Sequence, residues 1–311
     1  MNPSRPLRLG TRASALAMAQ SGQVAAAVTD KTGRAVELVE ITTYGDVSRE
    51  ALTQIGGTGV FVNALRDALL AGDIDLAVHS YKDLPTAPAA GLVLAAVPPR
   101  EDPRDALVAR DGCTLAELPA GARIGTGAPR RIAQLNALGF GIECVPIRGN
   151  VDTRIRKVTD GELDAVVLAR AGLARLDRLN AVTEVLDPML VLPAPAQGAL
   201  ALECRVGDAD LIELLGVLDD PDTRAAVAAE RSLLSALEAG CSAPVAAWAV
   251  LAESETGEPE LYLRGSVTAL DGSDAVRLSA SGPLHEADAI GRRLAADLLD
   301  AGAALLMGSP A

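Results

Sequence analysis

Short apolar runs typical of buried strands alternate with helix-forming segments from residue 7 to about residue 204. In the first part of the chain the predicted strands are 7–10, 36–42, a run that ends near Ser80, and 93–97. The predicted helices are an alanine-rich one from Ser14 to about Lys31, closed by Gly33, and a second over 61–71. This alternation favours an α/β fold.

The same alternation restarts after a proline-rich, charged segment at 98–105, which predicts a first crossing between domains. The predicted strands beyond it are 106–109, 123–125, 143–147 and 164–168, with helices near 115–118, after Pro129, and around Arg154. A second crossing is predicted at 191–198, so that strand 199–204 returns to the first lobe. We therefore expect two lobes of one layout, both with mixed sheets.

The last part of the chain has a different pattern. Predicted helices at 209–218 and 221–239 precede period-two strands at 245–250, 261–267 and 276–280 and a final helix at 285–301. This order predicts a small α+β domain. The predicted domains are 1–98 with 197–217, 104–192, and 221–311.

A long, glycine-dense connection runs from Gly45 to Gly59. Such a connection is typical of a mobile lid or of a disordered insert. The glycines are equally consistent with ordinary turns, and the sequence leaves these alternatives open.

Composition narrows the class of protein. The formal net charge of −13 argues against non-specific nucleic-acid binding. The four cysteines form no Cys-x-x-Cys pair and only two histidines are present, so no metal site is predicted. No signal peptide and no apolar run of membrane-spanning length are found, so we expect a cytoplasmic protein that does not enter a membrane.

Basic residues gather at the predicted strand ends, where ligands bind in open α/β sheets. They are Arg12, Lys82, Arg130, Arg131, Arg148, Arg154 and Arg175. Arginine binds carboxylates through two parallel hydrogen bonds, so the set predicts a polyanion cleft between two hinged domains. Asp83 is almost the only acid among these cations, although a lone Lys-Asp pair is also typical of a surface loop.

Two of these arginines, Arg130 and Arg131, are predicted in the first turn of a helix, where cations are unfavourable for the helix dipole. Either an anion docks at the exposed backbone N–H groups there, or the two side chains point to water.

An ordered set of motifs runs almost from end to end. It comprises Thr11-Arg-Ala-Ser-Ala-Leu-Ala17, Ala77-Val-His-Ser-Tyr-Lys-Asp-Leu-Pro85, Arg100-Glu-Asp-Pro-Arg-Asp-Ala106, Gly125-Thr126, Arg130-Arg131, Arg148-Gly-Asn-Val-Asp-Thr-Arg154, Leu168-Ala-Arg-Ala-Gly-Leu-Ala-Arg-Leu176, Gln197-Gly-Ala199 and Ala239-Gly-Cys241. In these motifs the chain resembles the porphobilinogen deaminase (hydroxymethylbilane synthase) family of tetrapyrrole biosynthesis.

The resemblance implies a monomeric transferase of three domains, the first two similar to type II periplasmic binding proteins. It implies that four porphobilinogen molecules are joined head to tail into hydroxymethylbilane with loss of ammonia, in the pathway to haem-type tetrapyrroles. Growth would start on a dipyrromethane cofactor bound by a thioether to Cys241. From the residues alone, Cys241 is a free thiol in a loop, more often inert than reactive.

The resemblance also implies roles for individual residues. Asp83 matches the catalytic carboxylate. The cofactor-binding positions are Cys241, Lys82, Ser80, Arg130, Arg131, Thr126, Arg154 and Phe61, although a core phenylalanine is an equally simple explanation of Phe61. The substrate-binding positions are Arg12, Ser14, Arg148, Arg154, Arg175 and Gln197.

Some positions depart from the family's pattern. Thr58 and Asn63 replace two lysines, and Tyr44 replaces a frequent arginine. Gly127-Ala128 stands where paired serines are common, and Ala196 and Ala239 replace glycines. These changes bear on the charge of the glycine-dense connection and on affinity more than on activity.

Two other classes of protein fit parts of the pattern. One is a non-catalytic cytoplasmic module that binds a polycarboxylate, which would need neither the cysteine nor the acid among the cations. The other is an arginine-rich nucleotide or RNA binder, against which the acidic total and the scarcity of aromatic residues speak.

Overall fold

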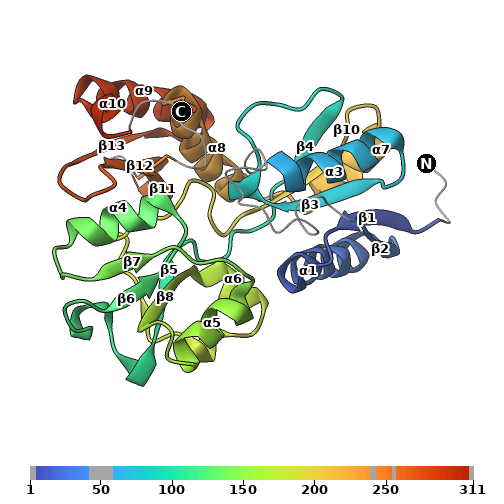
Figure 1. Cartoon of the computed structure of the whole chain (residues 1–311). Coiled ribbons are helices and arrows are strands. Elements are labelled where there is room, and N and C mark those ends of the chain that lie inside the picture. The colour runs from blue at the N-terminus through green and yellow to red at the C-terminus, as the bar shows by residue number, and fades with distance from the viewer. Residues whose placement is uncertain (1–4, 42–58, 239–242, 254–256, 308–311) are drawn as a thin grey trace. The chain divides into compact units, whose positions relative to one another are not determined.

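A computed structural model describes residues 5–41, 59–238, 243–253 and 257–307 of the chain. Contacts divide the chain into two compact units, Met1–Arg100 with Ala199–Arg224, and Glu101–Gly198 with Ala225–Ala311. The first unit contains one lobe, and the second contains another lobe and a C-terminal domain (Figure 1). The three predicted domain boundaries stay a prediction.

The first lobe is a mixed sheet covered by helices. Its elements are β1 (Leu7–Thr11), α1 (Ala15–Thr32), β2 (Val36–Glu40), α3 (Gly59–Ala71), β3 (Leu76–Ser80), the 3-10 helix η1 (Tyr81–Asp83), β4 (Leu92–Ala96), β10 (Leu200–Arg205) and α7 (Ala209–Gly216). Its described strands lie in the order β2-β1-β3-β10-β4, and β10 runs antiparallel to β3 and β4. The predicted return of the chain through 199–204 is confirmed.

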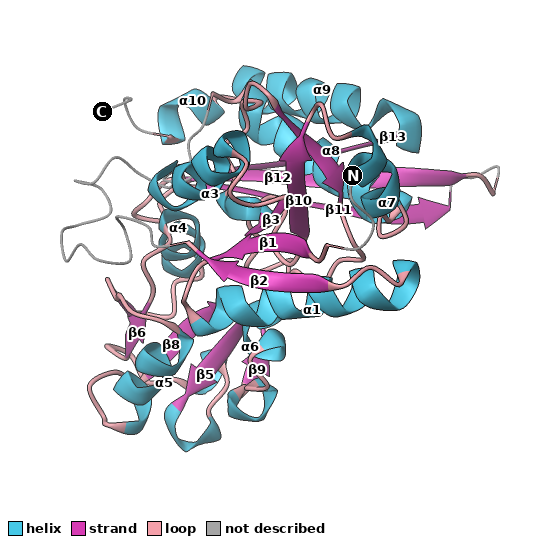
Figure 2. Ribbon diagram, turned by 90° about the vertical axis from the view of Figure 1, so that its right-hand side faces the viewer, coloured by secondary structure: helices cyan, strands magenta, loops and turns pink. Residues whose placement is uncertain are grey.

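Alternate residues of β3 face opposite sides of this sheet. Leu76 and Val78 pack in the core that α1 and α7 complete, and Ala77 packs with α3. Figure 2 shows α1 running along β1 and β2. Ser14 caps α1 by accepting a hydrogen bond from the Ala17 N–H, and Gly33 ends the helix with φ 71°, both as predicted.

The second lobe repeats this topology. Its elements are β5 (Asp105–Ala109), η2 (Arg110–Gly112), η3 (Leu115–Glu117), β6 (Arg123–Gly125), α4 (Pro129–Ala137), β7 (Glu143–Val145), α5 (Val151–Thr159), β8 (Ala165–Ala169), α6 (Arg170–Arg175), η4 (Leu179–Ala181) and β9 (Glu184–Val185). Its described strands lie in the order β7-β6-β8-β5-β9, with β5 antiparallel to its neighbours. In both lobes, the strand that follows a chain crossing is inserted antiparallel between two earlier or later strands.

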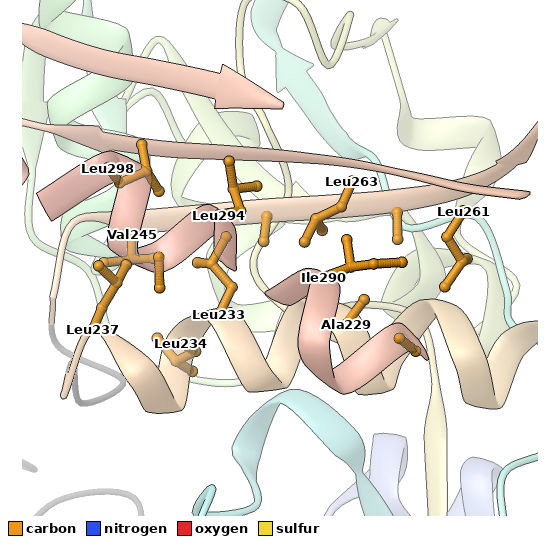
Figure 3. Packing of buried hydrophobic residues seen from close by; sticks show 14 of the residues in the cluster. Ala229, Leu233, Leu234, Leu237, Val245, Leu261, Leu263, Ile290, Leu294 and Leu298 are labelled. Carbon is orange, nitrogen blue, oxygen red and sulfur yellow. The ribbon is translucent and has the colours of Figure 1, made fainter. Parts of the chain in front are cut away.

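The C-terminal domain packs two helices on one face of an antiparallel sheet. Its elements are α8 (Pro221–Ala236), β11 (Val245–Glu253), β12 (Pro259–Thr268), β13 (Ala275–Pro283), η5 (Leu284–Glu286), α9 (Ala287–Asp300) and α10 (Ala303–Leu306). Leu233 of α8 and Leu294 of α9 meet Leu263 of β12 in its core (Figure 3). Together the two mixed sheets and this domain confirm the predicted fold class.

The structure differs from the sequence predictions at some element ends. The helix expected at 115–118 is the 3-10 helix η3, which begins at a capping box between Thr114 and Glu117. The strand expected over 143–147 ends at Val145, and β9 and α10 were not predicted. Except for Gly59, which begins α3, the connection predicted from Gly45 to Gly59 lies outside the described residues.

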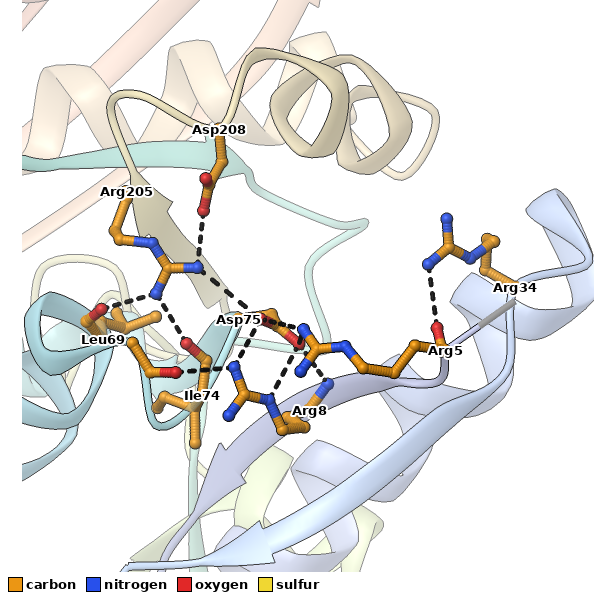
Figure 4. Close-up of polar contacts among 9 residues, drawn as sticks. Arg5, Arg8, Arg34, Leu69, Ile74, Asp75, Arg205 and Asp208 are labelled. Carbon is orange, nitrogen blue, oxygen red and sulfur yellow. Dashed lines mark hydrogen bonds and ion pairs between the residues drawn. The ribbon is translucent and has the colours of Figure 1, made fainter. Parts of the chain in front are cut away.

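Asp75 joins β1, the start of β3 and β10 at the edge of the first sheet opposite to the predicted site. Its carboxylate accepts hydrogen bonds from the Arg8 backbone N–H at 2.9 Å and from the side chains of Arg8 and Arg5 at 3.0 Å (Figure 4). Arg205 of β10 lies 3.6 Å from the same carboxylate and donates to the Leu69 and Ile74 carbonyls. Burial would raise the pKa of Asp75, but its bonds to Arg8 lower it overall.

Glu203 fastens α3 to the same sheet. Its carboxylate accepts hydrogen bonds from Arg66 of α3 at 3.0 and 2.7 Å, and His79 Nε2 of β3 lies 3.2 Å away. Burial would raise the pKa of Glu203, but His79 and Arg66 outweigh burial and lower it to about 2. The helix that leads into β3 is therefore anchored by a buried charge pair.

Asp105 ties together three segments of the second lobe. Its fully buried carboxylate accepts hydrogen bonds from Nη2 of Arg130, Nη2 of Arg131 and Nε2 of Gln197, each at 2.7 Å. Burial would raise the pKa of Asp105, but the two guanidinium groups hold it well below its usual range. Asp105 therefore stays charged and fixes α4 against β5.

The two crossing segments run side by side next to Asp105. Gln197 Nε2 also donates to the Pro103 carbonyl at 2.7 Å, and the Glu101 N–H donates to the Gly198 carbonyl at 3.3 Å. Gly198 has φ +89°, and a Cβ there would lie 2.3 Å from the Glu101 carbonyl oxygen. The close approach of the two segments therefore requires glycine at position 198.

Ala196, in the same segment, adopts φ 59°, a left-handed conformation that costs a non-glycine residue roughly 1–2 kcal/mol. Its N–H donates at 2.6 Å to the fully buried Glu230 of α8, whose other oxygen accepts from the Ala249 N–H at 2.8 Å. Glu230 thus holds the strained residue in place.

We expect Glu203→Gln to weaken the acid dependence of stability. Because the pKa of Glu203 falls from 4.5 to about 2 on folding, its charged pair stabilises the protein above pH 4.5 and this contribution is lost as the pH falls toward 2. The variant should lose about 2–3 kcal/mol at neutral pH and show a flatter decline below pH 4.5 in urea unfolding. Glu213→Gln on the exposed side of α7 is the control, and equal slopes in all three proteins would contradict this assignment.

We expect Asp105→Asn to destabilise the protein by about 3–5 kcal/mol, because it leaves two buried guanidinium groups without their counter-charge. The measurement is the free energy of unfolding in urea at neutral pH. Asp111→Asn, at a carboxylate with 83% of its side chain exposed, should change this free energy by less than about 0.5 kcal/mol. A loss no larger in Asp105→Asn than in the control would show that the cluster is not a main support of the lobe.

Candidate active site

The predicted site residues of the first unit lie at one edge of its sheet. β1 and β3 are parallel neighbours, with Leu9 opposite Leu76, so their carboxyl ends point the same way. Arg12 and Ser14 follow β1, and Ser80 ends β3. The structure thus brings Arg12, Ser14 and Ser80, which the sequence placed at the ends of separate strands, to one edge of the sheet.

The turn after β3 presents Asp83 to solvent. Lys82 and Asp83 lie in η1, which is held by the Tyr81 N–H donating to Ala199 at 3.0 Å and by the Leu84 N–H donating to Tyr81 at 3.2 Å. Leu84 is 3% exposed, whereas Asp83 is exposed and Lys82 is half-buried. A buried leucine therefore anchors the turn and leaves the neighbouring carboxylate accessible to a ligand.

The hydroxyl groups of this edge have defined partners. Ser80 Oγ accepts a hydrogen bond from Nε2 of Gln20, a buried residue of α1, at 2.8 Å. Ser14 Oγ accepts from the Ala17 N–H at 3.3 Å. Because both oxygens act as acceptors, each hydroxyl hydrogen stays available to donate to a carboxylate.

In the second unit, Thr126, Arg130 and Arg131 meet where β6 leads into α4. Thr126 is buried, and its Oγ1 accepts from the Ala128 N–H at 3.4 Å. Arg130 and Arg131 lie in the first turn of α4, as predicted, but they are only 5% and 6% exposed. Their guanidinium groups clamp Asp105 and also donate to the carbonyls of Leu192 and Val167.

One of the two explanations offered for these arginines is wrong, because their side chains do not point to water. The anion between their guanidinium groups is the protein's own Asp105, and an anion docked at the backbone N–H groups of the helix start stays a prediction. The expectation that Asp83 is almost the only acid among the cations is also wrong. Asp105 contacts two of them, and Glu101 lies near Arg175 and weakly opposes the lowering of its pKa by burial.

One nitrogen of this cluster fits an outside anion. Nε of Arg131 is buried and has no hydrogen-bond partner among the described residues. Arg154 of α5 is close enough that the charge of Arg131 adds to the lowering of its pKa by burial. Two neighbouring guanidinium groups and one unsatisfied donor are what the carboxylate of a dipyrromethane would need.

The other predicted residues of this unit differ in exposure. Arg148, after β7, is exposed, and Arg154 is half-buried with Nε donating to the Gly149 carbonyl at 2.8 Å. Arg175 and Gln197 belong to the crossing, since Arg175 donates to the Gly198 carbonyl at 2.7 Å and Gln197 is 1% exposed. These last two side chains already have structural partners.

Two predicted positions cannot be placed from side-chain contacts. Phe61 lies in α3, but its side chain is outside the described residues, and Cys241 is wholly outside them. Conversely, sequence reasoning missed Asp105. The only available signal was that two arginines at a helix start require a counter-charge, and nothing local indicates that it lies 25 and 26 residues earlier.

Comparison with known proteins covers nearly the whole chain. Residues 7–213 match the family model of the porphobilinogen deaminase dipyromethane cofactor binding domain, and residues 224–300 match that of the porphobilinogen deaminase C-terminal domain. Among solved structures, the methionine-binding protein MetQ matches with a TM-score of 0.44 and 15% identity, over 68% of this chain and 89% of that chain.

Curated relatives agree with the family models. Porphobilinogen deaminase 1 of Streptomyces coelicolor is 65% identical over 99% of both chains. Porphobilinogen deaminase of Mycobacterium tuberculosis is 57% identical over 97% of this chain and 98% of its own. The chain therefore belongs to the porphobilinogen deaminase family.

Proposed function

We propose that the protein is a hydroxymethylbilane synthase, which joins porphobilinogen molecules head to tail and releases ammonia, in tetrapyrrole biosynthesis. The observation that carries this proposal is the match of both family models over 7–213 and 224–300, with Asp83 exposed beside cations at the carboxyl end of β3. We propose further that it acts as a monomer in the cytoplasm.

The cations have a clear role in this proposal. Each porphobilinogen carries an acetate and a propionate, so each added unit brings negative charge to a protein whose net charge is already −13. Arg12, Arg148 and Arg154 would bind these carboxylates through paired hydrogen bonds. Ser14, Arg175 and Gln197 complete the proposed substrate-binding set, and the cleft expected between the lobes stays a prediction.

Asp83 would act on the pyrrole nitrogen. Positive charge develops on the pyrrole when ammonia leaves and again when the next ring attacks. A carboxylate at the nitrogen stabilises this charge and can accept the proton that is lost when the ring becomes aromatic again, a contribution of about 10²–10⁴-fold in rate. Lys82 beside it would bind a carboxylate of the same chain.

A dipyrromethane held by a thioether to Cys241 would supply the pyrrole end on which growth starts. We propose that its carboxylates are bound by Ser80 and Lys82 of the first unit and by Thr126, Arg154 and Nε of Arg131 of the second. In the second unit, Arg130 and Arg131 are both held by Asp105. Phe61 is proposed to pack against its rings.

Two further properties belong to the proposal. The acidic net charge supports a protein that does not bind nucleic acid. Within the residues described, no helix is both long and apolar enough to cross a bilayer.

We expect the protein, expressed in a host that makes porphobilinogen, to carry a dipyrrole adduct visible in its intact mass. Cys241→Ser should lack the adduct, because the proposed thioether needs this sulfur. Cys113→Ser, at a half-buried thiol of the second lobe, should keep it. An unmodified wild-type protein would instead favour a non-catalytic polycarboxylate-binding module.

We expect Asp83→Asn to keep the fold and the adduct but to lower the rate of hydroxymethylbilane formation by about 10²–10⁴-fold. Asp83 is exposed, so the amide should fit without repacking. Asp73→Asn, at an exposed carboxylate before the other end of β3, is the control and should retain a normal rate. Near-normal turnover by Asp83→Asn would remove Asp83 from the mechanism while leaving the family assignment intact.

A further inference from the structure

A cavity of about 410 Å³ lies in the second unit, and none of the residues proposed for catalysis lines it. Its walls come from Gln134 of α4, the loop 188–192, and strands β12 and β13. Alternate residues of β12 face opposite sides of the sheet, so Leu261 and Leu263 pack on the helices of the C-terminal domain. Tyr262 and Arg264 therefore face the cavity.

Two cations lie on this face. Arg264 of β12 is opposite Ser279, and Arg277 of β13 is opposite Ser266, so the two arginines occupy diagonal positions, roughly 7–8 Å apart at the backbone. Among the described residues, no carboxylate lines the cavity, and neither guanidinium group has an acidic side chain within ion-pair distance. Arg292 of the same domain, in contrast, pairs with Asp288.

The two arginines are held in position by Tyr262 and Met189. The Arg264 guanidinium lies 5.3 Å from the centre of the Tyr262 ring and contacts the sulfur of Met189. Nη1 of Arg277 donates to the Met189 carbonyl at 3.4 Å. Met189 is 60% exposed at the same cavity. Both charges therefore sit beside an exposed apolar wall.

We propose that this cavity binds a small planar molecule that carries two carboxylates. Two diagonal guanidinium groups match two carboxylates on one ring, and the side chains of Tyr262 and Met189 match the flat apolar face of that ring. The volume lies within the roughly 300–1,000 Å³ typical of small-molecule sites. Ser266 and Ser279 supply hydroxyl donors on the same strands.

Such a ligand would bridge the second lobe and the C-terminal domain. Loop 188–192 leads into the second crossing, and the Ala247 N–H of β11 already donates to the Pro193 carbonyl at 3.1 Å. The cavity shares no residue with the proposed catalytic or substrate-binding set, so occupancy acts on the junction and not on the residues proposed to bind porphobilinogen. Because it favours the folded state, a saturating ligand also raises the resistance of the protein to unfolding.

The single tryptophan of the chain gives a local measurement. Trp248 of β11 is directly opposite Arg264 and on the same face of the sheet. We expect titration of the whole protein with phthalate to change Trp248 emission in a saturable way. Arg264→Gln and Arg277→Gln should each raise the dissociation constant by about tenfold or more, the usual loss for a charged hydrogen bond.

Control ligands and a control variant separate this site from the proposed catalytic one. Phthalamide, which keeps the ring without charge, should not bind, and succinate, which keeps the charges without the ring, should bind more weakly than phthalate. Arg148→Gln should leave the Trp248 titration unchanged. The Arg264→Gln variant should retain the wild-type rate of hydroxymethylbilane formation in the absence of phthalate.

The proposal is overturned if phthalate gives no saturable change in Trp248 emission, or if the two arginine variants titrate like the wild type. An equal response to phthalamide would also overturn it, because the charges would then be irrelevant. A titration abolished by Arg148→Gln and not by Arg264→Gln would assign the binding to the proposed catalytic site instead.

Discussion

The carboxylate of Asp105 lies between two guanidinium groups at the point where both chain crossings meet the second lobe. Moving a carboxylate and two guanidinium groups out of water costs several kcal/mol for each ion, so the cluster is stable only while every partner is present. Two positive charges face one negative charge, which leaves a net positive potential in a buried setting. The position of α4, and with it Thr126 and Nε of Arg131, depends on this constraint.

Two residues that the family resemblance implies in substrate binding form hydrogen bonds within the chain crossings. Gln197 and Arg175 hold Pro103, Asp105 and Gly198 in place, whereas Arg148 is exposed. A carboxylate that bound Arg175 would compete with a backbone carbonyl for the same guanidinium group. In the second unit, the proposed ligand contacts and the geometry of the crossing are therefore physically linked.

Local pattern was sufficient for most elements of the fold and for the placement of Arg12, Ser80 and Asp83 at strand ends. These depend on periodicity, caps and turn residues within a few positions of each other. Asp105 with Arg130, and Glu203 with Arg66, could not be predicted, because each pairing joins distant segments and has no local signal. Short elements such as β9 were not predicted for another reason, because a strand of two residues has no periodicity to detect.

The insertion of β10 between β3 and β4 has a consequence for the order of folding during synthesis. The first lobe cannot complete its sheet until Leu200–Arg205 has left the ribosome, after the whole second lobe has been made. The strands β5 to β9, in contrast, all lie between Asp105 and Val185 and need no later segment to pair. The lobe that begins the chain is therefore the later one to close, and its unpaired strands depend on the nascent chain staying soluble until then.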